Sequence, residues 1–159
     1  MQQKMTAAEV RALLEGAFPR HFGPKGLLRI EDVGPGTAQV RFAADERHVR
    51  PGGTVSGPTL MGLSDSAFYV ALLGIIGPVP LAVTSNLNIN FLRRAKPGIL
   101  IADARLMKVG KRLATGEVSI RREGEEALVS HCVVTYSIPP AGQEMPNGDK
   151  LPLVQNTEL

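Results

Sequence analysis

One stretch, residues 54–74, limits what this chain can fold into, because it is a helix with almost no polar face. Ser56 is a favourable N-cap, Pro58 suits the first turn, and Gly74 is expected to end the helix. Its interior is apolar at nearly every position: Leu60, Met61, Leu63, Ala67, Phe68, Val70, Ala71, Leu72 and Leu73. A helix that is apolar nearly all round is buried, so the rest of the fold must enclose it.

A single carboxylate, Asp65, interrupts this apolar helix, with only Ser64 and Ser66 as polar neighbours in the sequence. A charge among apolar side chains is costly unless it is paired or used in chemistry. Asp65 could bond hydroxyl groups in a polar cluster of the core, or it could be a catalytic carboxylate. We favour the catalytic interpretation.

The remaining chain predicts an antiparallel sheet around this helix. An amphipathic helix over residues 6–18 begins at Thr6 and is ended by Pro19. Alternating or apolar runs bounded by turn residues predict strands at 27–33, 37–42, 83–91, 99–109, 114–122 and 127–138. The short turns between the later strands indicate antiparallel neighbours. The expected fold class is α+β, one antiparallel sheet wrapped around one buried central helix.

The expected organisation is an N-terminal helix and linker (1–24), one domain (25–138) and a flexible C-terminal tail (139–159) with a solvated composition. We expect the outer face and the edges of the sheet to remain apolar, which favours association with a second copy of the chain.

The composition argues against several classes of function. A net charge of +3, with 4% aromatic residues and no tryptophan, gives no reason to expect a nucleic-acid partner. Glycines and prolines break the longest apolar run, so no membrane span is expected. Cys132 is the only cysteine, which excludes an internal disulfide and fits a reducing, cytoplasmic location. No His, Cys or carboxylate cluster has the spacing of metal ligands, so we expect no metal.

The segment Arg50-Pro51-Gly52-Gly53-Thr54-Val55-Ser56-Gly57-Pro58, followed by Leu63 and Asp65, resembles a known motif. It is similar to that of the hotdog-fold acyl-CoA thioesterases of the PaaI-like group (phenylacetyl-CoA and hydroxybenzoyl-CoA thioesterases). Gly53, Gly57, Leu63 and Asp65 match the family pattern. Three positions depart from it, since Arg50 replaces an Asn, Ser56 replaces a His and Pro58 replaces a second Gly.

The resemblance implies a role for three residues. Gly57, at the helix N-terminus, offers its N–H to the thioester carbonyl, a placement that the helix dipole also favours. Asp65 acts as general base or nucleophile, and Thr84, on the polar face of its strand, supports the carboxylate or the water. The three could instead be, respectively, a conformational glycine, a structural carboxylate and an ordinary strand threonine. No cofactor is implied beyond the coenzyme A of the substrate.

A distance argument predicts an oligomer. Eight residues of helix span about 12 Å, so Gly57 and Asp65 of one chain cannot reach the same carbonyl. Two antiparallel helices in a symmetric dimer would bring Gly57 of one subunit near Asp65 of the other. The resemblance also implies a homodimer, or a homotetramer built from two dimers.

Other candidates have plainer alternatives. Ser56 is a possible catalytic residue but fits better as an N-cap. His48 could bind substrate in place of the missing histidine, or simply be a solvated loop residue, and His131 is expected to be structural. Basic and turn residues are candidates for binding coenzyme A phosphates, although a solvated sheet rim would look the same: Arg50, Arg94, Lys108, Gly110, Lys111 and Arg112.

The favoured function is an acyl-CoA thioesterase acting on a small or medium acyl or aryl group. The alternative is a non-catalytic hotdog protein that binds acyl-CoA, because the usual Asn and His are replaced. A hotdog dehydratase is less favoured, since those enzymes pair His with a carboxylate and position 56 is Ser.

Overall fold

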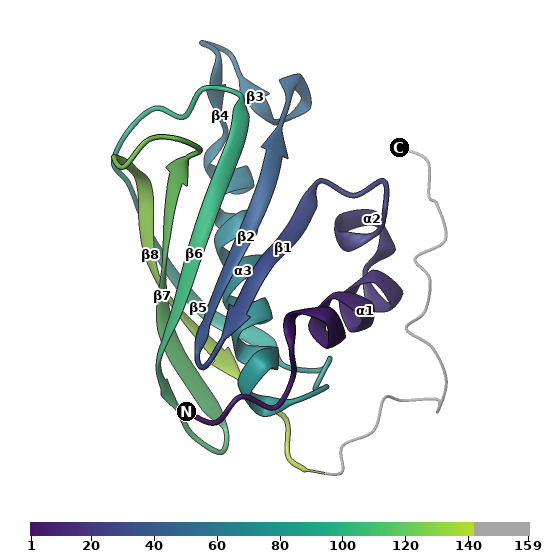
Figure 1. The fold of residues 1–159 in the computed structure, drawn as a ribbon. Helices are drawn as coiled ribbons and strands as arrows, with labels where there is room; N and C mark the ends of the chain where they lie inside the picture. The colour runs from purple at the N-terminus through teal and green to yellow at the C-terminus, as the bar shows by residue number, and fades with distance from the viewer. Residues whose placement is uncertain (142–159) are drawn as a thin grey trace.

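The computed structural model describes residues 1–141 and places one long helix against one antiparallel sheet (Figure 1). The elements, in chain order, are α1 (Ala7–Ala17), α2 (Pro19–Phe22), β1 (Leu28–Gly34), β2 (Thr37–Ala44), a 3₁₀ turn η1 (Glu46–His48), β3 (Val49–Arg50), β4 (Thr54–Val55), α3 (Gly57–Ile76), β5 (Val83–Phe91), β6 (Gly98–Val109), β7 (Leu113–Arg122) and β8 (Leu128–Ser137). The main sheet has six strands in the order β1-β2-β6-β7-β8-β5, and β3 and β4 form a separate small hairpin. The predicted α+β architecture is confirmed.

Helix α3 fills the concave side of the sheet because its apolar side chains face the strands. Phe68, Val70, Leu72 and Leu73 are fully buried in the core. Helix α3 is long and apolar enough to cross a membrane. However, 67% of its most apolar 18-residue stretch is buried inside the protein, as expected of a core helix.

The helix is not buried all round, however. Along its first half a stripe of residues faces away from the sheet: Pro58 and Gly62 are exposed, Met61 is 39% exposed, and Asp65 and Ser66 are half-buried. The expectation of a helix without an open face was therefore wrong. These positions recur at three- and four-residue spacing and so lie on one side of the helix.

The predicted end of the helix at Gly74 is also wrong. The helix continues to Ile76 and ends at Gly77, whose φ of 92° favours glycine. Gly74 is instead a close-packing position, since a Cβ there would lie 2.7 Å from Cγ1 of Val33. Its carbonyl accepts the N–H groups of Lys4 and Met5, which ties the N-terminus of the chain to the helix.

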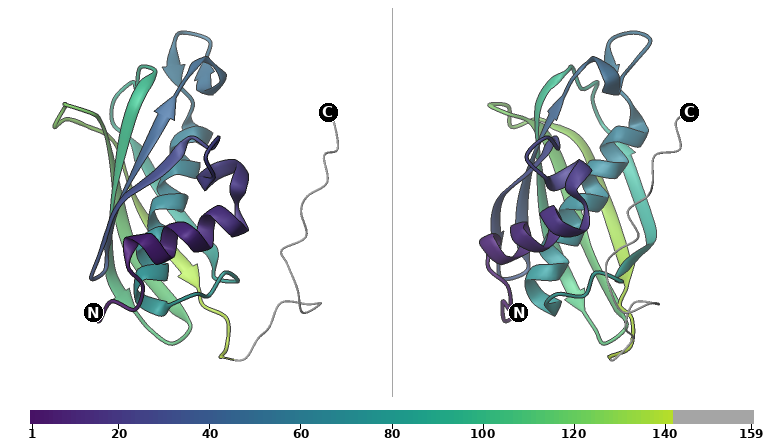
Figure 2. Two further views of the ribbon diagram at one scale, coloured as in Figure 1. Left: turned by 45° about the vertical axis from the view of Figure 1, so that its right-hand side comes forward. Right: turned by 90° about the vertical axis from the view of Figure 1, so that its right-hand side faces the viewer.

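The N-terminal helix packs into the same core as the sheet. Thr6 and Glu9 form the expected capping box, and Val10 and Leu14 are fully buried. Pro19 ends α1, as predicted, but it also begins α2, a short helix that the sequence analysis did not anticipate. Figure 2 shows α1 lying across α3 on the side opposite the sheet. The predicted tail (139–159) lies outside the described residues from position 142 onward.

Strand β5 lies at an edge of the sheet and pairs with β8. Its register shifts between Thr84 and Asn86, so Ser85 is an extra residue, a β-bulge. A one-residue shift moves a side chain to the other face of the sheet. Thr84 therefore points toward α3 with Leu87 and Ile89, whereas Val83 and Phe91 are 56% and 52% exposed. The prediction that Thr84 lies opposite the apolar positions of its strand is corrected.

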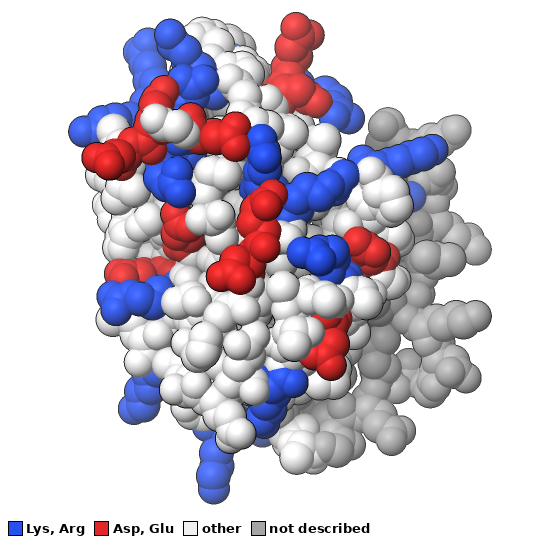
Figure 3. All heavy atoms as spheres, in the orientation of Figure 1, with Lys and Arg blue, Asp and Glu red and all other residues white. Residues whose placement is uncertain are grey.

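The outer face of the sheet is polar, contrary to expectation. It carries three ion pairs, Arg41–Glu123, Arg105–Glu117 and Arg121–Asp103. Figure 3 shows acidic and basic side chains interspersed over this part of the surface. The outer-face apolar side chains that remain exposed are scattered: Met107, Leu113 and Val133. The open side of α3 and the edge strand β5 are better candidates for association.

We predict that Gly74→Ala lowers the free energy of unfolding by about 1–2 kcal/mol, measured by urea denaturation. The added methyl group would crowd the stiff, buried Val33. Gly16→Ala is the matched control, because a Cβ at this helical position meets no atom within 4 Å. That substitution should stabilise by up to about 1 kcal/mol through helix propensity. Equal stabilisation by both substitutions would contradict the packing role of Gly74.

Candidate active site

Asp65 is held by two hydroxyl groups from the sheet. Thr84, on β5, donates its Oγ1–H to Oδ1 of Asp65 at 2.5 Å, and Tyr136, on β8, donates its phenolic O–H to the same oxygen at 2.8 Å. The carboxylate is half-buried. Asp65 is therefore not alone among apolar side chains, and its partners come from strands rather than from Ser64 and Ser66. The bulge at Ser85 is what directs Thr84 toward it.

The two hydrogen bonds leave the carboxylate asymmetric. Both reach Oδ1, and within residues 1–141 no hydrogen-bond donor contacts Oδ2. A carboxylate with one oxygen held by donors keeps its lone pairs on the other oxygen available to accept a proton. A carboxylate arranged in this way can accept a proton through Oδ2.

Tyr136 is the partner of Asp65 that the sequence analysis missed. Its ring is buried, stacks on Tyr69 at 5.8 Å between centroids and contacts Phe68 at 5.2 Å. Burial raises the pKa of the Tyr136 phenol far above its usual range, and the nearby Asp65 charge raises it further. A signal was present, because Tyr136 lies at an inward position of its strand and a buried tyrosine needs a partner for its hydroxyl.

A cavity of about 280 Å³ opens beside Asp65. The carboxylate, Thr84 and Tyr136 line one side of it, and Phe18, Phe22 and Tyr69 contribute rings. Tyr69 donates its hydroxyl to the carbonyl of Pro80 at 3.0 Å, and burial raises its pKa to about 12. The carboxylate therefore faces a space whose lining combines aromatic rings with polar groups, among them His21, Ser66 and Thr84.

Gly57 lies at a different cavity, of about 550 Å³, at the N-terminus of α3. As the first residue of the helix, it has an N–H without an intrahelical partner. Arg50 and Arg94, both predicted to bind substrate, line this cavity, and so does Arg93, which was not predicted. The structure therefore brings Gly57 together with cationic side chains and not with Asp65.

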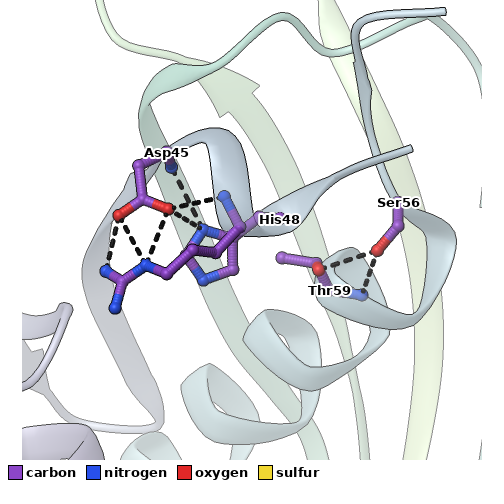
Figure 4. Close-up of polar contacts among 5 residues, drawn as sticks. Asp45, His48, Ser56 and Thr59 are labelled. Carbon is purple, nitrogen blue, oxygen red and sulfur yellow. Dashed lines mark hydrogen bonds and ion pairs between the residues drawn. The ribbon is translucent and has the colours of Figure 1, made fainter. Parts of the chain in front are cut away.

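Ser56 is the N-cap of α3. Its Oγ accepts the N–H of Thr59 at 3.4 Å and is 2.8 Å from the hydroxyl of Thr59 (Figure 4). No histidine or carboxylate contacts this hydroxyl within the described part of the chain, so the geometry favours capping over catalysis.

His48 is turned into the protein rather than toward a substrate. Its Nδ1 accepts the backbone N–H of Asp45 at 3.1 Å (Figure 4). Its ring makes a T-shaped contact with that of Phe42. Arg47 holds the pKa of the Asp45 carboxyl down, at about 2. His48 thus stabilises the η1 turn before Gly57, and its predicted contact with substrate gains no support from this geometry.

The remaining predicted residues lie in the β6–β7 hairpin, away from the Gly57 cavity. Lys108 pairs with Thr115 near the end of the β6–β7 ladder, and Lys111 and Arg112 are exposed in the turn. The N–H of Gly110 is donated to the carbonyl of Leu113 at 2.8 Å and is therefore not free for a phosphate, contrary to its expected use. A role of the three basic side chains in substrate binding stays a prediction.

His131 lies on the outer face of the sheet, where its Nε2 is 3.2 Å from Oε2 of Glu117. Arg105 is the main reason that the pKa of this glutamate lies below its usual range, and His131 adds to it. Cys132 is fully buried, and burial raises the pKa of its thiol. Over residues 1–141, no group of three or more His, Cys, Asp or Glu side chains could hold a metal ion.

Comparisons with known proteins agree with this geometry. A sequence model described as the thioesterase superfamily matches residues 52–129. A proposed esterase of Halobacterium salinarum is 33% identical over 125 residues, which cover 72% of this chain and 79% of that protein.

Solved structures are similar as well. The crystal structure of a proposed thioesterase from a Silicibacter species has 39% sequence identity and a TM-score of 0.79, and the match covers 88% of this chain and 96% of that one. A mutant of the phenylacetic acid degradation protein PaaI from Thermus thermophilus has 27% identity and a TM-score of 0.62 over 70% of this chain and 93% of that one. The matched residues 52–129 contain Gly57, Asp65 and Thr84 but not Tyr136.

We predict that neither tyrosine ionises in the folded protein at about pH 11, where an unperturbed phenol is about nine-tenths ionised. Tyr69 and Tyr136 are the only two tyrosines, so phenolate absorbance reports on this stack alone. Because their pKa values are raised on folding, the free energy of unfolding is undiminished below about pH 10 and falls as the pH rises above it. The same protein in guanidinium chloride should titrate near pH 10. Phenolate formation near that pH without denaturant would rule out the buried stack.

Proposed function

The chain belongs to the hotdog thioesterase superfamily, and from this premise we propose that it is a thioester hydrolase acting on acyl-CoA, with Asp65 as the base that activates water. The observation that carries the proposal is the carboxylate of Asp65, which lines a cavity and is held by Thr84 and Tyr136 through Oδ1 alone. A carboxylate that only stabilised the core would have no reason to keep one oxygen unbonded beside a cavity.

The carbonyl oxygen is polarised by Gly57 of a second subunit in this proposal. The stripe Pro58, Met61 and Gly62 is open on the side of α3 that bears Asp65, and β5 is an unpaired sheet edge next to it. Gly57 and Asp65 are separated by about 12 Å along the helix and lie in different cavities, so neither site is complete in one chain. An antiparallel pairing of two α3 helices about a two-fold axis would join the two half-sites twice.

The reaction needs only water. Oδ2 of Asp65 accepts a proton from a water molecule as its oxygen attacks the thioester carbon. The carbonyl electron pair moves to oxygen, where the N–H of Gly57 and the positive end of α3 stabilise the charge. Collapse of this intermediate breaks the C–S bond, and the proton on Asp65 passes to the departing thiolate. The products are the free acid and coenzyme A.

The coenzyme A part of the substrate fits the Gly57 cavity by charge. Arg50, Arg93 and Arg94 offer guanidinium groups suited to phosphate oxygens. We propose no cofactor, since side chains and backbone N–H groups supply every group that the proposed reaction needs. A cytoplasmic location fits a coenzyme A substrate and the single, buried Cys132.

We predict that Asp65→Asn lowers kcat by about 10²–10⁴-fold, because the amide cannot accept the proton from water. The measurement is thiol release from a panel of aliphatic and aryl acyl-CoAs, with folding confirmed by circular dichroism. Asp103→Asn is the matched control, a carboxylate on the outer face of the sheet bound to Gln39 and Arg121. It should retain native kcat.

The same acyl-CoA panel distinguishes hydrolysis from the alternative function, binding without catalysis, which the replacements at Arg50 and Ser56 suggest. Calorimetric binding of acyl-CoA without turnover by the native protein would establish that alternative. Native turnover that survives Asp65→Asn would remove Asp65 from the mechanism.

Gly57→Pro should abolish most activity because it removes the N–H that polarises the carbonyl. Proline is compatible with the first helical position, and Ser56 already has the extended backbone that a residue before proline requires. Gly57→Ala is the matched control, since it keeps the N–H. Its Cβ would lie 3.2 Å from Cζ of the exposed Phe91 ring, which has room to move. We expect Gly57→Ala to retain far more activity than Gly57→Pro.

The same variant tests the shared site. A heterodimer of one Gly57→Pro chain and one Asp65→Asn chain, purified with two different affinity tags, has one site with both defects and one site with neither. About half of the native turnover per dimer is therefore expected, although each parent is inactive. An inactive heterodimer would place Gly57 and Asp65 of the same chain in one site.

A further inference from the structure

The two cavities along α3 differ in the side chains that line them, and this difference indicates how an acyl-CoA would be oriented when bound. Three arginines line the cavity at Gly57, whereas no Lys or Arg among residues 1–141 lines the cavity at Asp65, to which four rings contribute: Phe18, Phe22, Tyr69 and Tyr136. An acyl-CoA has one end with charged phosphates and one apolar end, the acyl group. Charged groups favour the first cavity and apolar carbon favours the second.

The N-terminal segment forms the wall of the Asp65 cavity that faces α3. Phe18, His21 and Phe22 come from the α1–α2 segment and line this cavity together with Tyr69 and Ala82. The rings of Phe18 and Tyr69 meet edge to face, with centroids 6.2 Å apart and an interplanar angle of 84°. Tyr69 in turn stacks on Tyr136, whose hydroxyl binds Asp65. Phe18 is thus connected to Asp65 through the rings of Tyr69 and Tyr136 and the hydrogen bond of Tyr136.

We propose that the Asp65 cavity holds the acyl group and that Phe18 limits the length of acyl chain the enzyme accepts. This inference rests on the proposed function. A cavity of about 280 Å³ suits a compact acyl group, and the ring of Phe18 occupies the space that a longer chain would need. Phe18 lies in the N-terminal segment, outside the residues 52–129 that match the family model.

Phe18 is the wall residue that can be changed without disturbing the base. Tyr69 and Tyr136 have hydroxyl groups in hydrogen bonds that hold Pro80 and Asp65. Phe22 is 7% exposed and belongs to the core. Phe18 is half-buried at the C-cap of α1, with its apolar ring roughly perpendicular to that of Tyr69. Its removal should enlarge the cavity while Asp65, Thr84 and Tyr136 keep their contacts.

The experiment compares kcat/KM for butyryl-, octanoyl- and lauroyl-CoA in the native protein, Phe18→Ala and Phe18→Leu. We expect Phe18→Ala to raise the lauroyl-to-butyryl ratio of kcat/KM by about tenfold or more. A change of this size is typical when an apolar pocket gains room for additional methylene groups of the substrate. Phe18→Leu should give a smaller rise, and it covers the case in which Phe18→Ala does not fold. Leu13→Ala is the matched control, because this half-buried residue packs α1 on the core and does not line the cavity. It should leave the ratio unchanged.

Binding provides a second readout that does not need turnover. Binding is measured by calorimetry in two proteins, Asp65→Asn and the double variant Asp65→Asn/Phe18→Ala. The double variant should bind lauroyl-CoA more tightly relative to butyryl-CoA than the single variant does. An unchanged ratio in both assays would overturn the role of Phe18, and it would leave the proposed function intact if Asp65→Asn abolishes native turnover. Absence of native turnover on every acyl-CoA would instead overturn the proposed hydrolysis, and the binding assay would still decide whether Phe18 sets the chain length.

Discussion

The enclosure of α3 by the concave face of the sheet is the constraint on which the rest of the structure depends. Phe68, Val70 and Leu72 are fully buried, and burying such a side chain contributes about 1.5–3 kcal/mol. Turning the helix by one residue would expose several of them together. The direction of Asp65 is therefore set by its apolar neighbours, because it lies on the side of the helix that the sheet leaves open. The same constraint sets the position of the Gly57 amide at the helix end.

Much of the fold could be predicted from local patterns. An apolar helix with a Ser56 cap, and strands with short turns between them, follow from periodicity and cap chemistry, which act over a few residues. The end of α3 could not be predicted, because Gly74 and Gly77 look alike in the sequence. What separates them is Val33, which packs on Gly74 from a strand some forty residues away. Likewise, nothing local indicates that Ser85 forms a bulge, and the alternating pattern of β5 placed Thr84 on the wrong face.

The candidate site also combines residues that the local sequence indicates with residues that only long-range contacts bring to it. Asp65 could be found because a carboxylate in an apolar helix is unusual at the level of the sequence itself. Tyr136 could not be assigned to it, since the contact joins residues 71 positions apart and depends on the pairing of β5 with β8. The role of His48 was missed for the opposite reason. Its partner Asp45 is only three residues away, and a local capping contact was passed over in favour of a contact with substrate.

The length of α3 links the fold to the proposed chemistry. In the proposed function the phosphates of coenzyme A and the acyl group need different surroundings, since phosphates favour arginines and acyl carbon favours rings. The helix provides that separation, about 12 Å between Gly57 and Asp65, but it also separates the two groups proposed to act on the thioester. A two-fold axis resolves the conflict in the proposed dimer, because each ring-lined cavity then faces the arginines of the other subunit. The contacts that stabilise the dimer and the contacts that complete the site would then be the same, so catalysis and assembly would depend on the same open face of α3.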